Sequence, residues 1–158
     1  MYLRITTIVL AALLLIVLGS AYHLSATVLG KQADFENKVR NWVQERTTIT
    51  EIDSIDEYRG KQSYAVVIGK NRAGTKVIAW LTEDTIAFDT MERMVTRESV
   101  EASVKQGFPT GKILHLVPGM DENSRFWEVT LKNADGRFHY IHYDLYTGAV
   151  LTSYLVSP

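Results

Sequence analysis

The stretch that decides the fold runs from Arg125 to Val150 and reads RFWEVTLKNADGRFHYIHYDLYTGAV. Apolar and polar residues alternate over 127–132 and again over 138–144, which is the pattern of strands with one buried face. Between them, Asn-Ala-Asp-Gly at 133–136 tolerates the positive φ angles of a tight turn. A second turn at 144–148 leads into another strand. The stretch therefore predicts an antiparallel meander.

The composition excludes several classes of protein. The chain has 158 residues and a formal net charge of −1, and its basic residues are scattered, so no surface for nucleic acid is indicated. It contains no cysteine, which excludes disulfides, thiolate metal sites and cysteine nucleophiles. This length suits one ordinary domain or two very small ones.

The N-terminal segment predicts a membrane anchor. No charged residue occurs from Ile5 to Gly30, and about 20 apolar residues suffice to span a bilayer. We expect a retained signal-anchor helix within residues 1–30. The alternative is a cleaved signal peptide, because Gly19 and Ala21 offer small residues at the positions that a signal peptidase requires. Either interpretation sends the remainder across a membrane.

The orientation of the anchor follows less directly. Only Arg4 precedes the helix, whereas several basic residues follow it, and a simple charge count would keep the C-terminal side in the cytoplasm. Long domains, however, cross membranes largely regardless of charge. We expect a single-pass protein of the cell membrane with a short cytoplasmic tail and an extracytoplasmic C-terminal domain.

Residues 31–90 predict a first unit of one helix and antiparallel strands. Phe35, Val39 and Val43 share one face of a helix with Trp42. Residues 91–158 predict a second unit, in which Thr96 caps a helix that ends at Gly107, before strands that include the meander.

The two units share a short sequence pattern at corresponding places. The pattern Lys-Asn-x-x-Gly occurs at residues 70–74 and again at 132–136. We therefore expect the order α-β-β-β twice, with Thr82–Val95 as a connector, in one rigid body. The fold class is α+β, each unit packing one helix on an antiparallel sheet behind the transmembrane helix.

The second unit resembles a PepSY domain. The resemblance is carried by Phe126–Leu131, by Asp135-Gly136 and by the segment from Tyr143 to Val150. With its anchor and a preceding cystatin-like unit, the whole chain resembles the YpmB-like membrane-anchored proteins of Gram-positive bacteria. The resemblance implies a regulatory module for peptidases or cell-wall enzymes. The motif residues that it carries over are Trp127, Asp144 and Gly148, and their types suit structural roles in a strand and a turn.

The sequence offers little equipment for catalysis. We find no fingerprint of a hydrolase, metalloprotease or nucleotide-binding loop, and we predict no catalytic residue, cofactor or metal. His139 and His142 point to opposite sheet faces and cannot chelate one ion together. The alternative is a small hydrolase or metal-binding enzyme, with a site between the two units that uses His115, His139 or Asp144.

A cluster of tyrosines suggests contact with a partner. Tyrosine and arginine are enriched where proteins bind one another, and we nominate Arg125, Tyr140, Tyr143 and Tyr146 as candidate partner contacts. The leading hypothesis is a non-catalytic, membrane-tethered extracytoplasmic module that binds a peptidase or cell-wall enzyme. A third option is a domain that adds a peptide strand to an open sheet edge.

Overall fold

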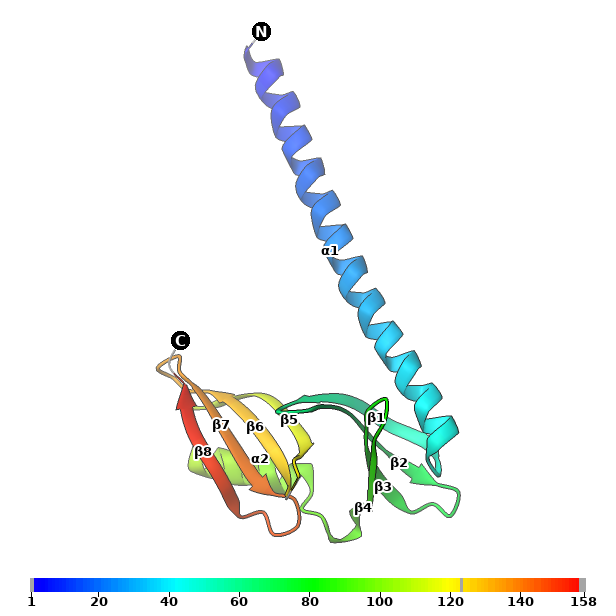
Figure 1. The fold of residues 1–158 in the computed structure, drawn as a ribbon. Coiled ribbons are helices and arrows are strands. Elements are labelled where there is room, and N and C mark those ends of the chain that lie inside the picture. Colours follow the sequence, from blue (N-terminus) through cyan, green and yellow to red (C-terminus); the bar gives the residue numbers. More distant parts are fainter. Residues whose placement is uncertain (1, 123, 157–158) are drawn as a thin grey trace. The chain divides into compact units, whose positions relative to one another are not determined.

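The structure, a computed structural model, describes residues 2–122 and 124–156, without the side chains of residues 2–12, 21, 24–26 and 28 (Figure 1). The chain divides into two compact units between Asn41 and Trp42. The helix α1, Tyr2–Arg46, makes up the first unit, and its last turn belongs to the second.

The helix α1 is rich in alanine and leucine, which favour helix formation. The run Leu13–Leu18 is more than half exposed at every position. Farther along, Gln32 donates to Glu36 at 3.0 Å, a contact between neighbours on one helix face. Among the described residues, no helix is long and apolar enough to cross a membrane. The structure therefore does not show the predicted membrane-spanning helix, and the anchor stays a prediction.

The second unit begins with an antiparallel sheet of four strands in sequence order. They are β1 (Ile49–Arg59), β2 (Ser63–Asn71), β3 (Lys76–Leu81) and β4 (Ile86–Thr90). The connector predicted at Thr82–Val95 was wrong for the β4 segment, because β4 pairs with β3 over its whole length. Its large apolar side chains, Ile86 and Phe88, are exposed by 37% and 39%, so the usual signal of a half-buried strand is weak.

A 3-10 turn, η1 (Met91–Arg93), leads to the second helix and sheet. The helix α2 (Arg97–Gly107) begins after Thr96, whose Oγ1 accepts from the Ser99 N–H at 3.2 Å. The four strands of the second antiparallel sheet again follow one another in sequence order: β5 (Lys112–Met120), β6 (Arg125–Lys132), β7 (Phe138–Asp144) and β8 (Val150–Val156).

The repeated Lys-Asn-x-x-Gly pattern forms the same kind of turn in both sheets. Gly74 and Gly136 have φ angles of 81° and 85°. Their N–H groups donate to the carbonyls of Asn71 and Asn133 at 2.9 and 3.0 Å. Each turn joins the second and third strands of its sheet, β2 and β3 in the first and β6 and β7 in the second. Glycine is required there because other residues adopt positive φ only at a cost.

One hydrophobic core joins the two sheets and α2. It contains Trp80 and Ile78 of β3, Val100 and Val104 of α2, and Trp127 of β6. The Trp80 indole N–H donates to the Pro118 carbonyl at 3.2 Å, from the first sheet to the second.

The α+β prediction with tandem antiparallel sheets is confirmed, with four strands in each sheet. The domain boundaries predicted at residues 30 and 90 stay predictions.

Candidate functional site

A groove of about 730 Å³ opens between two hairpin turns, one from each sheet. Five aromatic side chains line it: Tyr58, Tyr64, Phe126, Tyr140 and Tyr154. The β1–β2 turn contributes Arg59 and Lys61 at the rim, and the β5–β6 turn contributes Asp121 and Glu122. The groove thus has an aromatic wall and charges of both signs at its mouth, a composition suited to a protein or peptide ligand.

The strand register builds the aromatic wall. Tyr140 lies opposite Tyr154 in the β7–β8 ladder, and the two rings stack with centroids 5.3 Å apart. His142 lies opposite Glu128 in the β6–β7 ladder and stacks on Phe126 at 4.0 Å. Side chains two positions apart on a strand share a face, so the register brings all of these groups to one side of the second sheet.

A histidine–carboxylate pair lies on the floor of the groove. The His142 Nε2 atom is 3.1 Å from the Glu128 Oε2 atom, and the two side chains are only 19% and 15% exposed. Burial, with the charges of Glu128 and Asp121, raises the pKa of Tyr58 to about 12. Burial and the Glu128 charge also raise the pKa of Tyr154. Both hydroxyls therefore stay protonated at neutral pH and can donate hydrogen bonds to a ligand.

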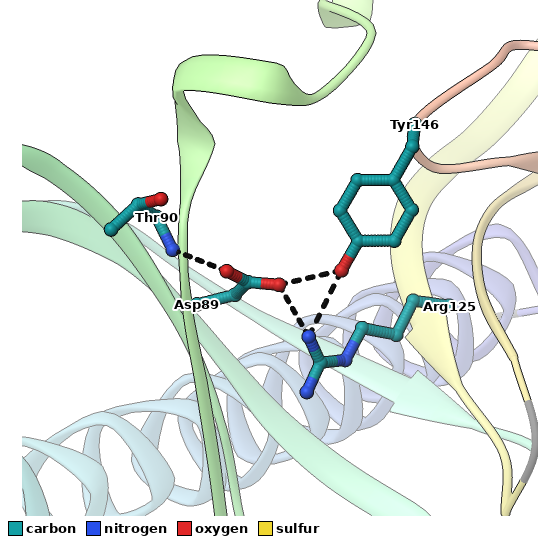
Figure 2. Close-up of polar contacts among 4 residues, drawn as sticks. All are labelled: Asp89, Thr90, Arg125 and Tyr146. Atoms are coloured by element: carbon teal, nitrogen blue, oxygen red, sulfur yellow. Dashed lines mark hydrogen bonds and ion pairs between the residues drawn. The ribbon is translucent and has the colours of Figure 1, made fainter.

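A second polar cluster joins the sheets outside the groove (Figure 2). The Arg125 guanidinium pairs with the Asp89 carboxylate and donates to the Tyr146 hydroxyl at 2.9 Å. The same Asp89 oxygen accepts from the Tyr146 hydroxyl at 2.5 Å, and the other accepts from the Thr90 N–H at 2.7 Å. We call Asp89, Arg125 and Tyr146 the cross-sheet cluster.

The cross-sheet cluster holds its carboxylate ionised. Burial by itself would raise the pKa of Asp89, but hydrogen bonds from Tyr146 and Thr90 and the Arg125 charge outweigh it and lower that pKa. The Arg125 guanidinium carbon also lies 5.2 Å from the centre of the Trp80 ring, a cation–π contact to the other sheet.

The structure separates the four predicted partner contacts. Tyr140 lines the groove, whereas Arg125 and Tyr146 belong to the cross-sheet cluster. Tyr143 is 5% exposed and lies in the core, where burial raises its pKa. Its side chain shares the face of β7 that carries Ile141 into the core, and a partner contact at Tyr143 stays a prediction.

The three motif residues lie in packing and turn positions. The Trp127 indole N–H donates to the Val95 carbonyl at 2.9 Å. Asp144 accepts from the N–H groups of Tyr146 and Thr147 at 3.0 and 2.7 Å, and Gly148 has a φ angle of 71°. The turn after β7 is thereby closed by the Asp144 side chain.

The histidines of the alternative hypothesis do not converge in the described structure. His139 contacts Ser153 at 2.8 Å and the Phe108 ring, on the opposite sheet face from His142. His115 is exposed in a separate shallow hollow beside Asp56. Within the described residues, no three histidine, aspartate or glutamate side chains form a metal-binding group.

Three residues of the groove and the cross-sheet cluster were not predicted from the sequence: Tyr58, Glu128 and Asp89. Glu128 and His142 could have been paired from the alternation of the two meander strands, because one precedes and the other follows the turn at 133–136 by matching distances. The participation of Tyr58 and Asp89 depends on packing between the two sheets, which carries no local signal.

The comparisons with known proteins agree with this architecture. The model of the "Cell wall elongation regulator TseB-like domain" family matches residues 41–82. The "Probable cell wall elongation regulator TseB" of Bacillus subtilis (strain 168) is 20% identical over 150 residues, covering 93% of each chain. The solved structure of the "YpmB protein from Bacillus subtilis" has a TM-score of 0.61 and 22% identity, covering 73% of this chain and 91% of that one.

The fold and the groove define an α+β protein in which two four-stranded antiparallel sheets share one core. The matches to known proteins indicate a more specific class. The chain is similar to YpmB/TseB-like proteins, the resemblance that its sequence predicts.

Proposed function

We propose that this protein is a non-catalytic regulatory module that acts on cell-wall elongation by binding a peptidase or cell-wall enzyme. The groove carries the proposal, because its aromatic wall and protonated tyrosine hydroxyls suit recognition of a protein surface. A relative named as a probable cell wall elongation regulator, aligned over 93% of each chain, supports the pathway.

The proposal includes a membrane tether. It is supported by the uncharged sequence from Ile5 to Gly30 and by the exposed apolar run Leu13–Leu18. We place the sheets on the outer side of a single-pass helix. Protease added to intact, wall-free cells should digest the domain while a cytoplasmic marker survives. Protection of the domain would contradict this orientation.

The binding role is tested by changing the groove wall. Tyr154→Ala removes one ring of the Tyr140–Tyr154 stack from a strand that is otherwise exposed, so the fold should tolerate it. The full-length Tyr154→Ala chain is cross-linked in cell membranes and purified by affinity, and the partner should no longer be recovered with it. Cell length should change as it does in a strain that lacks the protein.

The matched control is Phe88→Ala, which removes an aromatic ring of similar exposure from β4 of the first sheet, outside the groove. This variant should retain both the partner and normal cell length. If Tyr154→Ala keeps its partner, or if both variants lose it equally, the groove is not the binding surface.

A second candidate function is a small hydrolase, favoured by the Glu128–His142 pair on the groove floor. A carboxylate that orients a histidine is an arrangement used in general base catalysis. If the chain is an enzyme, His142→Gln should abolish complementation and leave partner capture intact. If the chain is a regulatory binding module, a His142→Gln variant that still captures the partner should also restore the phenotype of a deletion strain.

A further inference from the structure

The last strand, β8, is an exposed apolar edge. It lies at the end of the second sheet, paired only with β7 among the described strands. All of its residues are exposed, and five of them are large and apolar: Val150, Leu151, Tyr154, Leu155 and Val156. An unpaired edge presents a row of free backbone donors and acceptors, which another strand can pair with.

The other described sheet edges carry the features that discourage such pairing. The edge strand β1 contains Glu51 and Asp53, and the short β4 contains Asp89. The edge strand β5 contains Pro118, which cannot donate a ladder hydrogen bond. Within the described strands, β8 is the one edge with neither a charge nor a proline. This contrast indicates that β8 is kept open for an occupant.

The sequence of β8 identifies the occupant. Val-Leu-Thr-Ser-Tyr-Leu-Val is nearly palindromic around Ser153. We propose that β8 pairs antiparallel with β8 of a second copy of this chain, across a two-fold axis at Ser153. In that register Ser153 faces its own equivalent, Thr152 faces Tyr154 of the second copy, and each outer leucine or valine faces the same residue type.

Such a pair satisfies the rules of an isologous interface. The same patch serves both copies, apolar residues meet apolar residues, and no like charges are brought together because the strand is uncharged. A bulge leaves Leu151 unpaired in the β7–β8 ladder, so the regular residues Thr152, Ser153 and Tyr154 set the register about the axis.

The pairing has a consequence for the groove. Residues directly opposite in an antiparallel pair point to the same face. Tyr154 lines the groove, so the grooves of the two copies would open on the same side of one continuous sheet. The dimer would present two equivalent binding sites to a partner, whether or not the partner is a cell-wall enzyme.

Engineered cysteines test this register, since the natural chain has none. Opposed residues lie about 4.5–5.5 Å apart between Cα atoms, which a disulfide accepts, whereas diagonal neighbours lie about 7–8 Å apart. The full chain in mild detergent is oxidised with copper phenanthroline and separated by non-reducing electrophoresis. Ser153→Cys should give several-fold more disulfide dimer than Thr152→Cys, and Leu155→Cys should give the least.

The two neighbouring cysteine variants are the matched controls, because any association through the N-terminal helix would bring all three positions together alike. Equal dimer yield from the three variants, or no dimer from Ser153→Cys, would overturn the proposal. Ser153→Lys provides a second measurement, because it opposes two ammonium groups at the axis. Analytical ultracentrifugation should show the natural chain as a dimer and Ser153→Lys as a monomer of unchanged circular dichroism. A natural chain that sediments as a monomer at every concentration would also overturn it.

Discussion

The Asp89 carboxylate on β4 and the Arg125 guanidinium on β6 form an ion pair that joins the two sheets. Both side chains are less than a third exposed, at 27% and 30%, and Tyr146 contacts both of them. Removing one partner of a partly buried, hydrogen-bonded pair costs more than removing one partner of a surface salt bridge, because the remaining charge is left desolvated and unpaired.

We expect Asp89→Asn to lower the free energy of unfolding by about 1–3 kcal/mol. Arg125→Met should have a similar effect, and the double variant should lose less than the sum of the two, with a coupling of about 1 kcal/mol. Urea unfolding followed by circular dichroism measures all three. Asp84→Asn, which removes an exposed carboxylate before β4, should change stability by less than about 0.5 kcal/mol. Additive single effects would show that the pair is not coupled.

Trp127 connects the second sheet to the segment before α2. Its ring is 2% exposed, and its indole N–H donates to the Val95 carbonyl. Trp127→Phe keeps an aromatic ring but removes the donor and part of the volume, so we expect a loss of about 2–4 kcal/mol in chemical unfolding. Trp42→Phe on the half-buried last turn of α1 is the comparison, and it should cost clearly less. Equal losses would argue against the hydrogen bond as the cause.

Gly148 holds a conformation that other residues adopt at a cost. Its φ angle is 71°, and a Cβ atom there would lie 3.4 Å from the Val95 side chain, an ordinary contact. The expected loss for Gly148→Ala therefore comes from the backbone, at about 1–2 kcal/mol. Gly107→Ala at the end of α2 is the matched control, because open space surrounds that position and its φ angle is not positive. Thermal unfolding measures both variants, and Gly107→Ala should be neutral or slightly stabilising.

Asp144 makes part of the stability depend on pH. The N–H of Thr147 is the main cause that lowers the pKa of Asp144 below its ordinary value of 3.8, aided by the Thr147 hydroxyl and the Tyr146 N–H. Since the folded pKa lies below the unfolded one, the unfolded chain takes up the proton first as pH falls. The stabilisation is complete above the unfolded pKa and is lost as pH falls through the folded pKa.

We therefore expect the difference in unfolding free energy between the natural chain and Asp144→Asn to shrink between about pH 6 and about pH 2. Urea titrations across that interval measure it. Asp84→Asn should show no comparable trend. A difference that stays constant with pH would mean that the Asp144 charge does not stabilise the turn.

The features that the sequence did not predict share one physical cause, which is packing between residues far apart in the chain. The sequence predicted a connector where β4 lies. The large apolar side chains of this strand, Ile86 and Phe88, are exposed, so β4 lacks the buried apolar face that a half-buried strand has. Tyr143 was nominated as a partner contact, and the burial of its amphipathic side chain is decided only by the core around it. In the same way, no local pattern joins Tyr58 to Phe126, whose rings meet edge to face at 5.7 Å across the two sheets.

The sequence by itself determined the meander, the two matching Lys-Asn-x-x-Gly turns and the cap at Thr96, because alternation, positive φ and capping are set by residues close in the chain. The tertiary structure decided that the two sheets share one core, that Asp89 meets Arg125, and that a groove forms beside Tyr154. These contacts join residues far apart in sequence, and their energies depend on desolvation and packing that arise only when both sheets are in place.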